Sequence, residues 1–315
     1  MNGTSLPRRS VLAGMAAMVT GLPGCSVLSP PRNEGPASVV PADAAFAVYR
    51  ARHEDTLIEL ARLFRLGYVE LQAANPGVDP WLPREGTAIR VPTRHLPPEA
   101  PRRGLVVNVG DMRAWYYDKD GKSVRSWPIG IGREGHDTPL GTTRIVKKQE
   151  LPTWYPPPSV RRERPELPRA VPPGPDNPLG SHALYLGWPA YLVHGTNIPW
   201  SVGRRQSNGC IRLYPEDIVE LYALVDVGTP VTVVDQPVKV AWLSGRLWVE
   251  AHPTRDQADE LEQRGSFTPV DDRAALARVL RMAGKHRERV DLAAVERILA
   301  ERRGWAEAVT PPVAT

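Results

Sequence analysis

Cysteine is nearly absent from the 315-residue sequence, which contains only Cys25 and Cys210, and this excludes a disulfide-rich scaffold. Long apolar runs are also missing: no segment offers eighteen consecutive apolar residues, so none is predicted to cross a membrane as a stable helix. The net charge is only +5 and the basic residues are scattered, so a dense basic face is lacking too. Because no recognisable nucleic-acid-binding module is present either, nucleic acid is not an expected partner.

The residues that are present describe a globular protein. Hydrophobic residues make up 42% of the chain and charged residues 24%, which are ordinary values, and 315 residues suffice for two or three domains. Proline is abundant, because 34 of 315 residues is about twice the usual share. Since proline disrupts helix interiors, we expect strands and loops to dominate much of the chain.

The first 25 residues carry two export motifs. Residues 7–12 (Pro-Arg-Arg-Ser-Val-Leu) are similar to a twin-arginine export signal, and a short apolar stretch follows them. Residues 22–25 (Leu-Pro-Gly-Cys) resemble a lipobox, in which the cysteine becomes the lipidated first residue of the mature protein. The resemblance implies a lipid anchor on Cys25 and a periplasmic location. The alternative is plain cleavage near this point, which would release a soluble periplasmic protein.

A linker and a small domain follow the export signal. Residues 26–44 are rich in Pro, Ser and Ala and are predicted to be the linker. Residues 45–95 have a strand–helix–helix–strand pattern, in which Asp55 is expected to cap the first helix and Gly67 to end it. This order, with Asp-Thr-Leu at 55–57 and Asn-Pro at 75–76, resembles a LysM module. The resemblance implies binding to the glycan of peptidoglycan; the alternative is a packing domain that no longer binds sugar.

Residues 104–235 have a mainly β pattern, with a helix predicted to begin at Pro215. Within them, residues 149–182 contain ten prolines, which predicts a long ordered loop without regular elements, as is typical of a functional lid. Residues 236–315 form a C-terminal appendage. It is predicted to contain a hairpin that turns at residues 244–245 and two helical stretches, the second capped by Asp291.

The strongest motif joins His194 to Cys210. It runs His-Gly-Thr-Asn at residues 194–197 and Ser-Asn-Gly-Cys-Ile-Arg-Leu at residues 207–213. This pattern resembles the catalytic domain of L,D-transpeptidases of the YkuD type, in the branch that includes ErfK and YbiS. Asn208 stands where many members have histidine. The resemblance implies a β-sandwich with a short helix, flanked here by the small α+β LysM-like domain and an α/β appendage.

The chemistry of the motif explains its residue types. A cysteine thiol is mostly protonated at neutral pH, so its attack on an amide needs a base, and this role falls to His194. The neighbouring imidazole is expected to lower the pKa of Cys210. Gly209 lets the backbone approach the thiol, and a backbone N–H near the cysteine is predicted to bind the developing oxyanion. Ser207 and the backbone of Gly195 are candidates for orienting the imidazole.

Three further residues are candidates for substrate binding. Arg212 carries a permanent positive charge that suits a carboxylate of a peptide stem, and its alternative role is a surface ion pair. Asn197 fits the family motif, and Trp154 lies in the lid.

No metal or other cofactor is predicted, because zinc would require a compact set of Cys and His ligands. The other histidines lack this arrangement: four lie outside the catalytic segment without ligand spacing and two lie in loops near the expected cleft (His53, His95, His252 and His286; His136 and His182).

The sequence therefore predicts a peptidoglycan L,D-transpeptidase. By resemblance, Cys210 would form a thioester with a tetrapeptide stem and pass the acyl group to an amine, either of another stem or of a lysine in a wall-anchored lipoprotein. Two alternatives stay open. Water could be the acceptor, which would make the protein an L,D-carboxypeptidase or hydrolase, or the protein could bind peptidoglycan without catalysis.

Overall fold

The computed structural model describes residues 46–312. The twin-arginine-like segment, the lipobox with Cys25 and the predicted linker (residues 26–44) lie outside this range. Among the described residues, no helix is both long enough and apolar enough to span a membrane.

The N-terminal region has the predicted order of elements, which are β1 (Phe46–Arg50), α1 (Leu57–Leu63), α2 (Tyr68–Ala74) and β2 (Ala88–Pro92). The two strands pair antiparallel, and the buried side chains of Leu57, Leu60, Leu71 and Ile89 form a core between them and the helices.

The helix boundaries in this region correct two expectations. Thr56, not Asp55, caps α1, because its hydroxyl accepts a hydrogen bond from the Glu59 N–H at 3.1 Å. The Asp55 carboxylate is engaged instead by the Arg52 N–H at 2.6 Å. Gly67 does not end α1, which stops at Leu63; it is the N-cap residue of α2.

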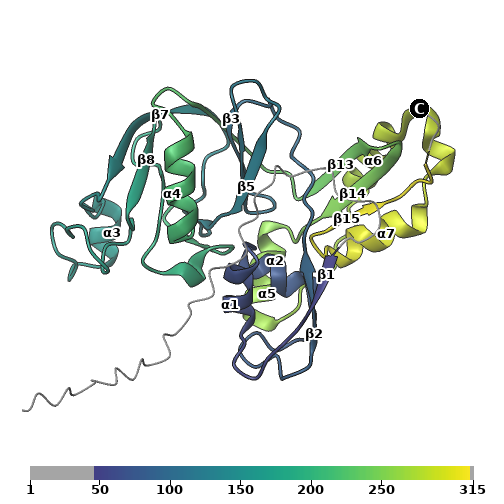
Figure 1. Cartoon of the computed structure of the whole chain (residues 1–315), viewed down its shortest axis with the longest axis horizontal. Helices are drawn as coiled ribbons and strands as arrows, with labels where there is room; N and C mark the ends of the chain where they lie inside the picture. The colour runs from purple at the N-terminus through teal and green to yellow at the C-terminus, as the bar shows by residue number, and fades with distance from the viewer. Residues whose placement is uncertain (1–45, 313–315) are drawn as a thin grey trace, which may run out of the picture. The chain divides into compact units, whose positions relative to one another are not determined.

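A single eight-stranded sheet forms the centre of the protein (Figure 1). Its order is β11-β9-β8-β7-β12-β3-β4-β5. The strands are β3 (Gly104–Asn108), β4 (Arg113–Tyr117), β5 (Val124–Pro128), β7 (Gly141–Glu150), β8 (His182–Leu186), β9 (Leu192–His194), β11 (Ile211–Arg212) and β12 (Pro230–Val234). Neighbouring strands are antiparallel except for two parallel pairs, β12 with β3 and β11 with β9.

The expected β-sandwich is thus one curled sheet. The ten residues of β7 connect its halves, because residues 141–144 pair with β12 and residues 145–150 pair with β8, with a register shift after Ile145. A separate parallel pair joins β6 (Ile131–Gly132) to β10 (Arg205–Ser207), and the short helix η1 (Pro199–Ser201) precedes β10.

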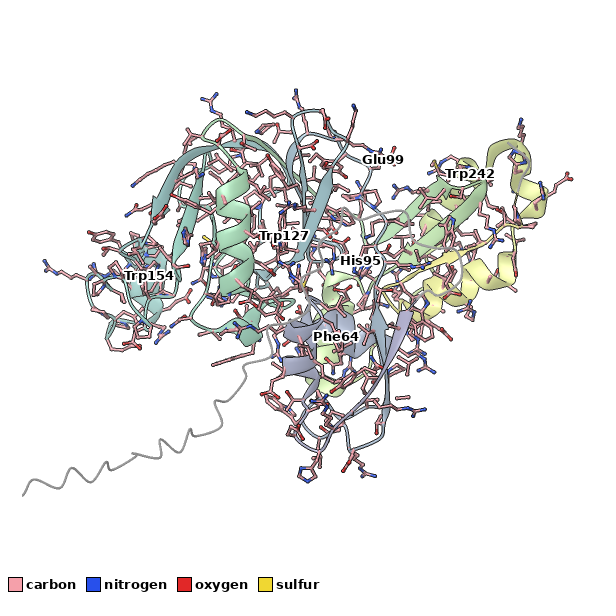
Figure 2. The ribbon with its side chains drawn as sticks, viewed as in Figure 1. Phe64, His95, Glu99, Trp127, Trp154 and Trp242 are labelled. Atoms are coloured by element: carbon pink, nitrogen blue, oxygen red, sulfur yellow. The ribbon has the colours of Figure 1, made fainter. Side chains whose placement is uncertain are left out.

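Helix α4 (Pro215–Leu224) fills the curl of the sheet (Figure 1). It begins at Pro215 as predicted, because a proline at the first helical position loses no internal hydrogen bond. Ile218 and Leu221 are fully buried in the cluster that also holds core residues of β3, β8 and β9. Trp127 of β5, labelled beside α4 in Figure 2, donates from Nε1 to Glu220 of the helix at 3.1 Å.

The long proline-rich loop contains one regular element that the sequence did not predict. Helix α3 (Pro158–Glu163) begins at a proline, where the missing N–H costs nothing, so the proline density does not exclude it. An isolated antiparallel bridge between Trp154 and Val171 brings the two arms of the loop together. The loop is therefore ordered: its two arms meet at this bridge, and it carries one short helix.

The C-terminal region contains β13 (Val238–Leu243), β14 (Arg246–Ala251) and β15 (Ala306–Ala308) in one sheet. Its helices are α5 (Arg255–Arg264), α6 (Arg273–Ala283), η2 (Gly284–Arg289) and α7 (Leu292–Glu301), so the two predicted helical stretches are three α-helices. Two predictions are confirmed: Ser244 and Gly245 turn the hairpin with positive φ angles of 48° and 70°, and Asp291 caps α7.

Candidate active site

His194 and Cys210 are brought together by the parallel pairing of β9 with β11. Arg212 lies opposite His194 in this pairing, and Ile211 lies opposite Val193. His194 is the last residue of β9, and Cys210 immediately precedes β11. Over the sixteen positions from His194 to Cys210, the chain passes from the end of β9 through η1 and β10 to the start of β11.

The loop that holds Cys210 is fixed by its own hydrogen bonds. The Ser207 hydroxyl donates to the Cys210 carbonyl at 2.6 Å and accepts from the Gly209 N–H at 3.1 Å, while the Thr138 hydroxyl donates to the Gly209 carbonyl at 2.9 Å. Ser207 therefore closes the nucleophile loop, whereas the sequence had suggested that it orients the imidazole. The Gly209 N–H is used within the loop and is not available to an oxyanion.

Glycine is required at position 209 for two reasons. Its φ of +100° is a conformation that other residues rarely adopt. A Cβ there would also lie 2.7 Å from Cε1 of Tyr191, well inside van der Waals contact. The prediction that Gly209 lets the backbone approach is consistent with this crowding.

The Cys210 thiol is half-buried and donates to the Ala190 carbonyl at 3.5 Å. Burial raises the pKa of Cys210 above its ordinary value, and the Leu192 backbone and the Arg212 charge only partly oppose this. The expected lowering of the cysteine pKa is therefore wrong for the free protein. The physical reason is that a neutral imidazole supplies no positive charge to stabilise a thiolate.

His194 is buried, and its imidazole is held by backbone groups. Nδ1 contacts the Gly195 carbonyl at 2.6 Å, and because a carbonyl can only accept, this nitrogen carries the proton. Burial, followed by the charge of Arg212, lowers the pKa of His194 to about 3. The imidazole is therefore neutral, with Nε2 left as a base, and the Gly195 backbone occupies the orienting position that the sequence suggested.

Arg212 lies close enough to act electrostatically on both groups. Its positive charge lowers the pKa of Cys210 and lowers that of His194, so it favours a thiolate and disfavours an imidazolium. Arg212 Nε and Asn197 Oδ1 are among the buried polar atoms that have no hydrogen-bond partner within residues 46–312. Both atoms belong to predicted substrate-binding residues.

Trp154 lies on the lid beside α3 (Figure 2). Its backbone exchanges two hydrogen bonds with Val171, at 2.9 and 2.8 Å, so its recorded contacts stabilise the lid. Its role as a substrate contact stays a prediction.

Asn177 is a structural residue of the lid that the sequence did not single out. It is fully buried, and its Nδ2 contacts the carbonyls of Pro152, Val171 and Pro172 at 2.7, 3.1 and 3.1 Å, while its Oδ1 accepts from the Leu179 N–H at 2.9 Å. The signal that could have revealed it is an asparagine within a proline-rich run, since amide side chains often satisfy backbone groups in such turns.

The segment after Asn177 reaches the imidazole. The Leu179 backbone hydrogen-bonds His194 and raises its pKa slightly against the larger effect of burial. A Cβ on Gly180, which has a φ of +66°, would lie 2.8 Å from the Thr196 nitrogen. The lid therefore ends in direct contact with the loop that carries the candidate base.

Asn177→Ala is expected to lower the free energy of unfolding by about 1–3 kcal/mol, because it leaves buried backbone groups without partners. Urea unfolding measures this loss, and limited proteolysis should show faster cleavage within residues 152–178. Asp176→Ala changes the exposed neighbouring side chain and should leave both measurements unchanged. Equal behaviour of the two variants would contradict the anchoring role.

Titration of the thiolate absorbance should give a Cys210 pKa above the ordinary cysteine value of 9.0, because burial dominates its environment. Cys210→Ser supplies the baseline. A thiolate already present near neutral pH would instead indicate a resting thiolate–imidazolium pair and contradict the neutral state of His194.

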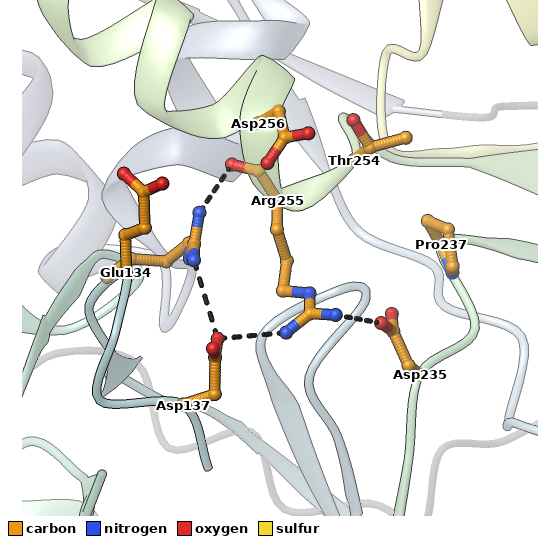
Figure 3. Close-up of a pocket in the computed structure, with 8 residues that line it drawn as sticks. Glu134, Asp137, Asp235, Pro237, Thr254, Arg255 and Asp256 are labelled. Carbon is orange, nitrogen blue, oxygen red and sulfur yellow. Dashed lines mark hydrogen bonds and ion pairs between the residues drawn. The ribbon is translucent and has the colours of Figure 1, made fainter.

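A pocket with a volume of about 440 Å³ lies elsewhere (Figure 3). Neither Cys210 nor His194 is among its described lining residues. Arg255 crosses it and pairs with Asp137 at 2.9 Å and Asp235 at 3.2 Å, as the dashed lines in Figure 3 show. The pocket is thus held by ion pairs between α5 and the catalytic region.

A buried charge cluster also corrects the interpretation of two histidines. Ligand atoms of His95, Glu250 and His252 lie within 4.8 Å of one another, although the sequence gave these histidines no shared spacing. Glu250 Oε1 contacts His252 Nε2 at 2.6 Å and Lys239 Nζ at 2.7 Å. The Lys239 ammonium therefore already supplies the cation that a metal ion would supply, and the cluster is an ion-pair network.

Comparisons with known proteins assign the class. A profile of the YkuD family, the L,D-transpeptidase catalytic domain, matches residues 102–233. The chain is 38% identical over 272 residues to the "Probable L,D-transpeptidase ErfK/SrfK" of Escherichia coli K12, covering 84% of this chain and 86% of that protein. The chain therefore belongs to the L,D-transpeptidase family.

Two further similarities were found. The "Probable L,D-transpeptidase YcfS" of Escherichia coli K12 is 41% identical over 215 residues, which cover 65% of this chain and 67% of that protein. The NMR structure of the catalytic domain of the Enterococcus faecium L,D-transpeptidase is 25% identical and covers 43% of this chain and 99% of that chain, with a TM-score of 0.35.

Proposed function

We propose that this protein is a peptidoglycan L,D-transpeptidase in which Cys210 attacks a tetrapeptide stem and His194 is the base. The observation that carries the proposal is the register of β9 and β11, in which His194, with a buried neutral imidazole, ends one strand and Cys210, with a free thiol, immediately precedes the neighbouring strand. Family membership supports the reaction class. The attacked group is the carbonyl at the L-centre of diaminopimelate, and the terminal D-alanine leaves.

The geometry supports a sequence of proton transfers. Nε2 of His194 takes the thiol proton as the sulfur attacks, because Nδ1 is already occupied by the Gly195 carbonyl. The same imidazolium then donates the proton to the departing amine of D-alanine. An incoming amine attacks the thioester and returns its proton to His194. The Cys210 N–H is the candidate oxyanion donor, since that of Gly209 is engaged with Ser207.

The buried charge of Arg212 has two uses in this scheme. It favours the thiolate during attack and discourages a resting imidazolium, which keeps the base free. Its Nε and the Oδ1 of Asn197 are buried without described partners, and such atoms are suited to hydrogen bonds with a bound stem. The acceptor is an amine of a second stem or of a lipoprotein lysine.

The test is the mass of the purified protein after incubation with muropeptides that carry tetrapeptide stems. A thioester adduct is expected on the wild type and not on Cys210→Ala, whereas Ser126→Ala, a change in β5, should form it normally. No adduct on the wild type would refute the proposal. Crosslinked products indicate an amine acceptor, and trimmed tripeptides indicate hydrolysis.

The N-terminal region is proposed to bind the glycan of peptidoglycan, and the N-terminal motifs to direct export and lipidation at Cys25. Support for glycan binding comes from the β1–α1–α2–β2 order and from Trp81, which is 67% exposed between α2 and β2 and offers a flat face to a sugar. Trp81→Ala should weaken sedimentation with insoluble peptidoglycan, whereas Leu292→Ala, exposed on α7, should not. Equal sedimentation would argue against a glycan site at Trp81.

A further inference from the structure

A cluster of four side chains connects the lid to the nucleophile loop; we call it the latch and define it as Arg133, His136, Glu163 and Asn208. Glu163, the last residue of α3, accepts from Arg133 Nη2 at 2.7 Å and lies 3.5 Å from His136 Nε2. Arg133 Nε also donates to Asn208 Oδ1 at 3.1 Å. The lid carboxylate is therefore bound by the Arg133 guanidinium, and Arg133 Nη2 also donates to His136 Nε2 at 3.1 Å, so the imidazole accepts from the guanidinium and orients it.

The basic half of the latch is fixed to the nucleophile loop. The Arg133 N–H donates to the Ser207 carbonyl at 2.9 Å, and the His136 N–H donates to the Arg133 carbonyl at 2.9 Å. The His136 carbonyl would lie 3.4 Å from a Cβ on Gly209. Asn208 is only two residues before Cys210. A carboxylate held by Arg133 is therefore attached to the loop that carries the candidate nucleophile.

The Glu163 carboxylate of the latch can be exchanged for a carboxylate from outside the protein. Arg133 is 42% exposed, Glu163 48% and His136 29%, and ion pairs this open to water contribute little net stability. The Asp137 carboxylate, which directly follows His136 in the chain, does not compete with Glu163 for Arg133, because it pairs with Arg255 and Arg205. A free carboxylate from outside can thus replace Glu163 without a large energetic penalty.

We propose that Arg133, whose guanidinium is oriented by His136, forms a carboxylate subsite for the donor peptide stem, and that Glu163 occupies this subsite when the lid is down. A donor carboxylate takes the place of Glu163, which frees α3 and opens the lid over Cys210. Arg212 serves a different group, since it is half-buried and its charge acts on the Cys210 thiol. This inference rests on the proposed acylation of Cys210. It adds which group of the donor stem is recognised and what opens the lid.

The test compares acylation of the full chain by the native stem with acylation by stems in which each carboxylate is amidated in turn. Amidating the carboxylate that binds the subsite should slow wild-type acylation about tenfold, the effect of one charge-assisted hydrogen bond in a partly exposed site. The stem that shows this loss identifies which carboxylate is bound. Arg133→Met should slow the native stem by a similar factor and remove the difference between the stems.

A substitution on the lid side of the latch, at Glu163, should have the opposite effect on the rate of acylation. Glu163→Gln should accelerate acylation by the native stem a few-fold, because the donor no longer competes with an internal carboxylate, and hydrogen exchange of α3 should increase. Glu166→Gln is the matched control on the same loop, since Glu166 pairs only with Arg164 in the recorded contacts and should change neither measurement.

Two outcomes overturn the inference while leaving the proposed function intact. In one, the wild type is acylated equally by all stems; in the other, Arg133→Met and Glu163→Gln both behave as the wild type. If Arg133→Met fails to fold, Arg133→Gln replaces it with the same expectations. Failure of the proposed function is distinguishable, because then no stem would acylate wild-type Cys210.

Discussion

His194→Ala is expected to slow acylation of Cys210 by about 10²–10⁴-fold, the usual contribution of a positioned base. The effect should be this large because burial raises the pKa of the thiol, so little thiolate exists without the imidazole. The second-order rate of adduct formation, followed by mass spectrometry, measures it. His53→Ala removes an exposed imidazole of the N-terminal region and should acylate at the wild-type rate.

The pH dependence separates loss of the base from loss of structure. The pKa of His194 is lowered to about 3, so its base form is present throughout the range above pH 5, and wild-type acylation should be nearly flat between pH 5 and 8. In His194→Ala attack requires free thiolate, so the residual rate should rise about tenfold for each pH unit. A wild-type profile with an acid limb near pH 6–7 would contradict the neutral buried imidazole.

Local features of the fold were predictable because they depend on neighbouring residues. Pro215 begins α4, Asp291 caps α7 and Ser244-Gly245 turns the last hairpin, each for a reason contained within a few residues. The competition between Asp55 and Thr56 for the cap of α1 was not predictable, since Asp55 is drawn away by the Arg52 N–H and by the hydroxyl of Tyr49.

The candidate site likewise has features that the sequence predicts and features that it does not. The residue types at 194 and 210 predict an imidazole and a thiol. The direction of each pKa shift depends on burial, which only the packed lid and sheet determine. Asn177 anchors the lid through carbonyls up to 25 residues away. The latch likewise joins Arg133, Glu163 and Asn208 from three separate segments, and no sequence spacing encodes that meeting.

Lys239→Met is expected to lower the free energy of unfolding by about 3–5 kcal/mol, the usual loss when one partner of a buried ion pair is removed. The ammonium of Lys239 is buried between Asp111 Oδ2 at 2.5 Å and Glu250 Oε1 at 2.7 Å. Methionine has a similar length but supplies no charge, so both carboxylates would remain buried without it. Lys119→Met, at an exposed position, should cost less than about 1 kcal/mol.

Denaturant unfolding at several pH values tests both the size and the origin of this loss. The charge of Lys239, together with hydrogen bonds from His252 and His95, holds the pKa of Glu250 well below its ordinary value of 4.5 despite the opposing effect of burial. A carboxylate with a lowered pKa contributes stability above its ordinary value and loses it as the pH falls through the folded value. The difference between Lys239→Met and the wild type should therefore shrink in acid. A difference independent of pH would assign the loss to packing, because lost side-chain contacts do not titrate.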